Sequence, residues 1–302
     1  MKKNLLGILG ALLAFGAQAK LNVVATTPDL AAIARAIGGD AITLTTLAKP
    51  TEDPHFVDAK PSFIVKLNRA DMLIEGGAEL EIGWLPALLD QSRNDKLAAG
   101  APGHVLCAQG VRLLEVPATL DRSKGDIHAA GNPHYLTDPV NARIVAKNIA
   151  DALCALDEKS AGTYRANLNT FNAALEAKLV EWQKTLAPFR GQTVVSYHDS
   201  WPYFGQRFGL KLDLFLEPKP GIPPTPAHLA QVITQMKQDR VRVIIVDPYL
   251  NLKTAETVAR NTDATVVAVT QFPGGVKGTD GGYLQMMDYL VNALAQALGK
   301  AK

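Results

Sequence analysis

Short β-branched runs alternate with amphipathic segments along the first third of the chain. Each run is rich in Val, Ile, Leu or Thr, and each following segment places apolar residues at helical spacing. The pairs occupy residues 22–26 and 31–37, 42–45 and 61–69, and 72–74 and 81–89. Strands that alternate with helices in this way predict parallel βα units.

The same alternation restarts after the middle of the chain. Further β-branched runs occupy residues 193–196, 212–216, 243–246 and 265–269. We therefore predict an α/β fold of two lobes, each with a mostly parallel sheet flanked by helices.

A long helical pattern separates the two groups of strands. Apolar residues recur there every three to five positions between residues 140 and 186, with a break expected near Gly162 and no proline after Pro139. This predicts a connector with a helix of more than 25 residues, stiff enough that the lobes move little relative to each other. The expected boundaries are 20–139 for the first lobe, 140–188 for the connector and 189–302 for the second lobe.

The start of the chain has the order of charges and apolar residues that is typical of a secretory signal. Lys2 and Lys3 precede an apolar run at residues 5–15, and the small-residue motif Ala17-Gln18-Ala19 follows. The run is too short to span a bilayer, and no cysteine lies at the expected cleavage point for a lipid anchor. We expect residues 1–19 to be a signal peptide and the mature protein to be soluble in the periplasm.

The charge of the mature chain argues against a nucleic-acid partner. The 302 residues include 31 Lys and Arg against 29 Asp and Glu, so losing Lys2 and Lys3 leaves 29 of each. A formally neutral chain without a basic run lacks what binding to phosphates requires. A composition with 47% hydrophobic residues also excludes disorder.

The two cysteines have no neighbours that indicate chemistry. Cys154 has no His, Lys or second Cys within three residues, and Cys107 has only His104, three positions before it, which disfavours a metal or redox role. In an oxidising compartment the pair is expected either to form a structural disulfide or to remain as two separately buried thiols.

Three of the six histidines share a distinctive context. His55 lies soon after the predicted strand 42–45, His134 follows Pro133 in a loop, and His198 follows the strand 193–196 directly. Loops at the carboxyl ends of parallel strands build the ligand sites of open α/β sheets, so these side chains are expected to converge. Imidazole is a preferred ligand of zinc, whereas manganese and magnesium prefer oxygen. The alternative is that each histidine only caps a helix or satisfies a backbone group.

Several longer motifs accompany these histidines. They are Pro54-His55 with Lys60-Pro61-Ser62, residues 77–81 with Trp84-Leu85, residues 132–139, residues 196–204, Thr225-Pro226 and residues 283–287. In these motifs the chain resembles the periplasmic solute-binding proteins of ABC importers for zinc and manganese, the cluster A-I or zinc-uptake type. The resemblance covers nearly the whole mature chain. The resemblance implies two α/β lobes joined by one rigid helix, with the metal between them.

The resemblance also implies a function and a set of ligands. His55, His134 and His198 stand at the positions of three family ligands, and a His at the third position resembles the zinc importers, whereas manganese importers tend to have Glu there. The implied protein is a monomeric, non-enzymatic receptor that captures Zn²⁺ as cargo and delivers it to a membrane permease. A manganese or iron carrier of the same fold is the nearest alternative.

The fourth family ligand is missing from its usual place. Thr270 stands where the family usually has Asp, and a neutral hydroxyl is a poor zinc ligand. Four completions stay open: Asp247, Asp280, Glu52 or water. A site of three histidines and a water also suggests a second class of function, a zinc-dependent hydrolase, but no His-Glu-x-x-His or Gly-x-Ser-x-Gly motif is present. Carriers of chelated iron or corrinoids would need aromatic or basic pocket residues instead.

The remaining candidates have supporting roles. Asp138 and Asp199 are expected either to orient His134 and His198 through hydrogen bonds or to cap helices. His128 lies in a polar loop where some family members carry a His-rich segment, and we expect it to be a solvated loop residue. His104 and His228 are expected in a surface loop and in the first turn of a helix.

Overall fold

The computed structural model describes residues 19–119, 125 and 128–300. The predicted signal peptide therefore lies outside the described residues, apart from Ala19. Within the described part of the chain, no helix combines the length and the apolar character that a bilayer span requires.

Two four-stranded sheets form the centres of the two lobes, and every strand pair in them is parallel. The first sheet has the order β2-β1-β3-β4 and the second the order β6-β5-β7-β8. The strands are β1 Leu21–Ala25, β2 Ile42–Thr46, β3 Met72–Glu75, β4 His104–Leu106, β5 Thr193–Ser196, β6 Lys211–Phe215, β7 Val243–Val246 and β8 Thr265–Ala268. The predicted fold class is confirmed.

Only β4 was not predicted from the hydrophobic pattern. It is three residues long and begins with a polar residue, His104, so it carries too few apolar positions to show a period. His104 was expected in a surface loop, and that expectation is wrong: its side chain is 8% exposed and is paired with Glu75 on the neighbouring strand.

Helices cover the sheets, and prolines mark where many of them begin. The α-helices are α1 Pro28–Gly38, α2 Pro61–Asn68, α3 Leu85–Ser92, α4 Pro139–Leu156, α5 Ala161–Leu186, α6 Pro202–Phe208, α7 Pro226–Gln238, α8 Leu252–Thr262 and α9 Tyr283–Lys300. Short 3-10 turns are η1 Gly39–Ala41, η2 Asp95–Leu97, η4 Tyr135–Thr137, η5 Glu158–Ser160 and η6 Ala187–Phe189. Proline suits a first helical position because its missing N–H has no intrahelical partner there.

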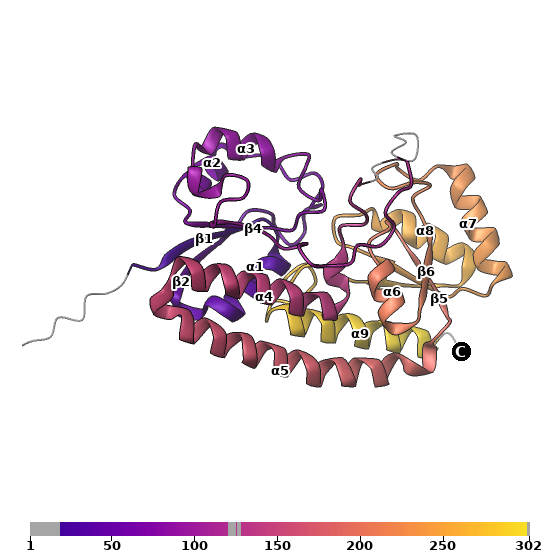
Figure 1. The fold of residues 1–302 in the computed structure, drawn as a ribbon. Coiled ribbons are helices and arrows are strands. Elements are labelled where there is room, and N and C mark those ends of the chain that lie inside the picture. Colours follow the sequence, from indigo (N-terminus) through magenta and orange to yellow (C-terminus); the bar gives the residue numbers. More distant parts are fainter. Residues whose placement is uncertain (1–18, 120–124, 126–127, 301–302) are drawn as a thin grey trace, which may run out of the picture.

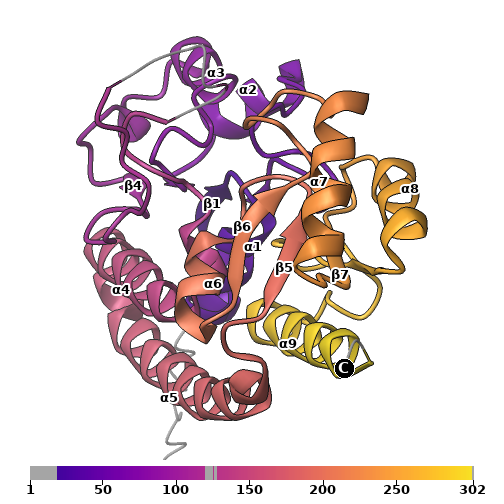
Figure 2. The ribbon, with the colours of Figure 1, turned by 90° about the vertical axis from the view of Figure 1, so that its right-hand side faces the viewer.

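The connector consists of two helices that pack on each other, α4 and the 26-residue α5. The break expected near Gly162 lies slightly earlier, at Asp157, whose carboxylate accepts a hydrogen bond from the Ser160 N–H. Helix α5 then runs beneath both lobes, with α9 packed beside it under the second lobe (Figures 1 and 2). The long helix implied by the family resemblance is present.

One apolar cluster continues from the first lobe into the second. It includes Val23 and Ile74 of the first sheet, Val243 and Ile245 of the second, and Trp182 of α5. Two smaller clusters fill the opposite faces of the two sheets. The two lobes are therefore joined by a shared hydrophobic core as well as by the helical connector.

The two cysteines are free thiols in the structure, so the disulfide considered above is not formed. Cys107 is buried beside Asn148 of α4, whose amide donates to the Cys107 carbonyl at 3.3 Å. Cys154, which is half-buried on α4, donates its thiol to the Ala161 carbonyl at 3.6 Å.

Trp182 gives a test of the contact between α5 and α9. Its ring is 2% exposed, and its Nε1 donates to Asp288 of α9 at 2.8 Å. We expect Trp182→Ala to lower the free energy of unfolding by about 3–5 kcal/mol in urea titrations, because a large cavity opens in the shared core. The control is Val180, which lies on the same helix and is 61% exposed: Val180→Ala should change the free energy of unfolding by less than about 0.5 kcal/mol. Equal effects of the two substitutions would contradict this role of Trp182.

Candidate metal centre

The three predicted histidines come from three loops and meet between the lobes. His55 lies in the loop that follows β2, His134 immediately precedes η4, and His198 lies two residues after β5. The first two belong to the first lobe and the third belongs to the second. His134 is buried, and the other two are half-buried.

Their nitrogen atoms lie close enough to share one ion. One ring nitrogen from each residue lies within 4.8 Å of the other two, and the Nε2 atoms of His55 and His134 are 3.2 Å apart. Two ligands of a tetrahedral zinc ion, each at about 2.0–2.1 Å from it, are about 3.3 Å apart. The donor set and its spacing therefore suit a divalent metal, and among the described residues this is the one cluster of metal-ligating side chains.

The three rings differ in their electrostatic surroundings. Burial, followed by the neighbouring histidines, lowers the pKa of both His55 and His134 well below the ordinary value of 6.5. Burial also acts to lower the pKa of His198, but the hydrogen bond and charge of Glu217 outweigh it, and the pKa is raised. Two of the rings are thus held neutral, ready to bind a cation, while the third binds a proton more readily.

Two residues that the sequence analysis missed contact these rings. His198 Nδ1 lies 2.7 Å from a carboxylate oxygen of Glu217, and the side chain of Gln271 is hydrogen-bonded to His134. Glu217 lies two residues after β6 and Gln271 three residues after β8. Their position at the ends of strands, the same signal that identified the histidines, would have found both.

Hydrogen bonds to neighbouring side chains hold the ligand loops in place. Trp84 Nε1 donates to the Pro54 carbonyl at 2.9 Å, next to His55. The side-chain oxygen Oδ1 of Asn132 accepts from the His134 N–H at 3.0 Å, and its side-chain nitrogen Nδ2 donates to the backbone carbonyl of Asp199 in the second lobe at 2.9 Å. Asn132 therefore ties the loop of His134 to the loop of His198.

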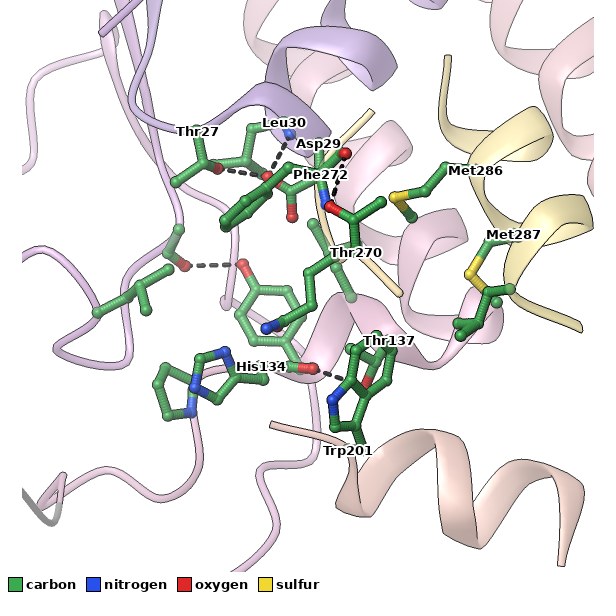
Figure 3. Close-up of a pocket in the computed structure, with 17 residues that line it drawn as sticks. Thr27, Asp29, Leu30, His134, Thr137, Trp201, Thr270, Phe272, Met286 and Met287 are labelled. Atoms are coloured by element: carbon green, nitrogen blue, oxygen red, sulfur yellow. Dashed lines mark hydrogen bonds between the residues drawn. The ribbon is translucent and has the colours of Figure 1, made fainter. Parts of the chain in front are cut away.

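Thr270 does not face the cluster as a ligand. Its hydroxyl donates to the Phe272 carbonyl at 2.9 Å and accepts from the Phe272 N–H at 3.0 Å. Thr270 and His134 line a cavity of about 20 Å³, and the Asp29 carboxyl lines it as well (Figure 3). Burial raises the pKa of Asp29 to about 6. A second carboxylate at position 270 would share this small space with Asp29, and the neutral Thr avoids that repulsion.

The structure does not bring the proposed fourth ligands into the cluster. Of these candidates, Asp247 has the surroundings most like those of a metal ligand: it is 2% exposed, and its Oδ1 has no hydrogen-bond partner among the described residues. Burial raises its pKa to about 7, although the nearby His198 acts to lower it. It is nevertheless outside the group that meets at 4.8 Å. Glu52 accepts from the Lys49 N–H, and Asp280 lines a separate cavity beside α1 and α9.

Neither Asp138 nor Asp199 is hydrogen-bonded to the ring of His134 or His198. Asp138 caps α4 by accepting from the Val140 N–H and forms a two-pronged ion pair with Arg207, so its role is the helix cap. Asp199 caps no described helix. Burial, followed by the charge of Glu115, raises its pKa to about 7, and both carboxyl groups line a cavity of about 130 Å³ beside His134 and His198.

Of the other two histidines, one lies where it was expected and the other does not. His228 lies in the first turn of α7, as expected. His128 was expected to be a solvated loop residue, but it is half-buried and its ring stacks on that of His55 with centroids 5.1 Å apart. It lines the same 130 Å³ cavity as Asp199, so a fourth imidazole lies at the edge of the site.

Comparisons with known proteins agree with this fold. A family model described as zinc-uptake complex component A, periplasmic (ZnuA), matches residues 23–297. The manganese ABC transporter substrate-binding lipoprotein PsaA of Streptococcus pneumoniae (strain TIGR4) is 26% identical over 290 residues, 93% of this chain and 90% of that protein. The metal ABC transporter substrate-binding lipoprotein FimA of Streptococcus parasanguinis is 25% identical over 293 residues, 94% and 91%.

Solved structures share the fold. A crystal structure of ZnuA superposes with a TM-score of 0.79 at 23% identity, covering 93% of this chain and 100% of that one. The manganese-bound periplasmic metal-binding protein of Candidatus Liberibacter asiaticus superposes with a TM-score of 0.77 at 21% identity, with the same coverage. With the family model matching nearly all of the described residues, the chain belongs to the ZnuA family of metal-binding, substrate-binding proteins of ABC importers, which are receptors and not enzymes.

Proposed function

We propose that this receptor captures Zn²⁺ and delivers it to the permease of an ABC importer. The observation that carries the proposal is the donor set: three imidazole nitrogens within 4.8 Å of one another and no carboxylate in the group. Nitrogen ligands favour zinc, and manganese prefers oxygen. The name of the matching family model supports zinc as well.

Manganese is the alternative that the relatives favour. PsaA of Streptococcus pneumoniae is named for manganese, and it is related to this chain along almost its whole length. A manganese site would need more oxygen ligands than this cluster offers. In our proposal water or a rearranged Asp247 completes the coordination of zinc, since Asp247 is buried beside His198 and has one oxygen without a partner.

The proposed setting follows from the start of the chain and from the family. Residues 1–19 carry the charge and apolar order of a secretory signal, with no cysteine near its end, which supports a periplasmic protein released from the membrane. We further propose that it acts as a monomer whose partner is the membrane permease. The connector at residues 140–188 then keeps the lobes, residues 20–139 and 189–302, in nearly fixed positions while the ion is carried.

Substitution of each ligand tests the proposal directly. Zinc should bind the chelator-stripped protein at one ion per chain, measured by competition with a chromophoric chelator. His55→Ala, His134→Ala and His198→Ala should each weaken binding by at least about tenfold, because each removes one of three ligands. His104→Ala is the control, since His104 of β4 pairs with Glu75 of β3 and lies outside the cluster. Equal losses in all four variants, or a wild-type protein that does not bind zinc, would contradict the assignment.

The dependence of zinc affinity on pH should occur in two stages. Protons compete with the metal for the ligand nitrogens, and each competing proton raises the Kd about tenfold per pH unit. Because the pKa of His198 is raised, a proton begins to compete with zinc for this ring above about pH 6.5. As the pH decreases towards 6, the fall in zinc affinity should therefore correspond to one competing proton.

A steeper fall is expected only in more acidic solution. The pKa values of His55 and His134 lie well below 6.5, so these rings stay neutral until then. The measurement is the zinc Kd at half-unit steps between about pH 8.5 and 5. A constant Kd over the whole range would exclude imidazole ligands, and a slope of three protons starting at pH 6.5 would contradict the difference between the rings.

The residue at position 198 should set the preference between metals. His198→Glu replaces a nitrogen ligand by oxygens, so we expect zinc affinity to fall by about tenfold or more while manganese affinity falls less or rises. The measured quantity is the ratio of the two Kd values, from titration with each metal. An unchanged ratio would show that the third ligand does not determine the cargo.

A further inference from the structure

The backbone places Glu217 beside His198 in the second lobe. Backbone pairing between the segments of β5 and β6 continues past the ends of the strands. The Leu216 N–H donates to the Ser196 carbonyl and the Glu217 N–H to the Tyr197 carbonyl, both at 3.0 Å. The parallel ladder therefore continues up to the metal site. Glu217 faces His198 because of strand register, not because of a flexible loop.

The carboxylate of Glu217 is held from two sides. One oxygen, Oε2, lies 2.7 Å from His198 Nδ1 and accepts from the Gly221 N–H at 3.1 Å. Gly221 has a φ of 72°, which favours glycine, in a tight turn closed by a bridge between Lys219 and Ile222. The side chains of Glu217 and His198 are only 10% and 13% exposed. Little freedom is left for either group to rotate.

This contact decides which nitrogen of His198 is available. A carboxylate can only accept a hydrogen bond, so Nδ1 must carry the proton and donate it to Glu217. Nε2 is then left with its lone pair for a cation. In the other tautomer Nε2 would carry the proton and could not bind a metal. His134 differs, because its partner is the neutral amide of Gln271, which can act as donor or acceptor.

We propose that Glu217 is a positioning residue for the metal centre: it fixes the tautomer and the ring orientation of His198 and thereby sets the affinity for the cation. The proposal rests on the proposed function, since it assigns Glu217 a role in the same site. Carboxylates that hold metal-binding histidines in this way typically contribute about 10–100-fold in metal affinity.

The test combines zinc affinity with a direct measurement of the tautomer. In Glu217→Ala the Kd for zinc should rise about 10–100-fold by chelator competition. Glu217→Gln keeps the shape of the side chain, and its carbonyl oxygen can still accept from Nδ1–H, so a smaller loss is expected. Its amide N–H can also donate to Nδ1, which raises the Nε2–H fraction. Nitrogen-15 NMR of the imidazoles in the metal-free protein, at about pH 8.5 where neutral rings prevail, should show Nδ1–H at His198 in the wild type. Both variants should show a larger Nε2–H fraction.

The chain supplies a matched control. His104 and Glu75 form a second histidine–carboxylate pair, 2.6 Å apart, that is not part of the metal cluster. Glu75→Gln should change the tautomer of His104 and leave the zinc Kd unchanged. Circular dichroism melting curves identify a variant that does not fold, in which case Glu217→Gln, the nearly isosteric change, decides the result.

The possible outcomes separate the two proposals. If wild-type protein binds zinc and both Glu217 variants bind as tightly with Nδ1–H retained, the role of Glu217 is refuted. If the wild type fails to bind zinc, the proposed function fails instead, while the tautomer measurement still reports whether Glu217 controls the His198 ring. A rise in Kd without any change of tautomer would also overturn the proposal, because the loss would then be structural.

Discussion

The candidate metal centre depends on the relative position of the two lobes, because His55 and His134 belong to one and His198 to the other. A shift of even 1 Å between the lobes would change the nitrogen separations that suit one ion. Three features oppose such a shift: the shared apolar cluster, helix α5 running beneath both lobes, and the hydrogen bonds of Asn132 across the boundary. The contacts between the lobes therefore hold the three histidines in position.

The sequence predicted the parts of the molecule that follow from periodicity. In seven of the eight strands every Val, Ile and Leu residue is buried or half-buried, and burial is what the hydrophobic pattern records. The three histidines were identifiable because each follows a strand or lies in a matching loop. Their convergence could be predicted from the rule that parallel strands end at one edge.

Other features depend on tertiary contacts that no local pattern records. β4 is too short to show a period, so His104 was assigned to a loop although Glu75 of the adjacent strand buries it. His128 lies against His55 only because their loops fold together. The two cysteines are free thiols, an outcome that depends on where the fold places them and not on their local sequence. Glu217 and Gln271 were missed for a different reason: the strand-end argument was applied to histidines alone.

The ligands also differ in what surrounds them, although all three are imidazoles. His134 is buried against Gln271 and His55 lies beside His128, whereas His198 rests against the charged Glu217. A site made of identical residues thus has two rings that resist protonation and one that is linked to a carboxylate. The division follows the lobes, so each lobe contributes a different electrostatic environment to the same site.

The neutral hydroxyl at Thr270 has a consequence for the charge balance of the loaded receptor. Three imidazoles carry no charge, so a divalent ion bound by them retains its full double charge, and no described carboxylate belongs to the cluster that would neutralise it directly. Glu217 acts through His198, and Asp247 lies beside the cluster rather than in it. Compensation from such a distance is weaker than direct coordination. With water as the fourth ligand, the loaded receptor should therefore present a locally positive cleft to its transporter, whereas coordination by Asp247 would neutralise part of that charge.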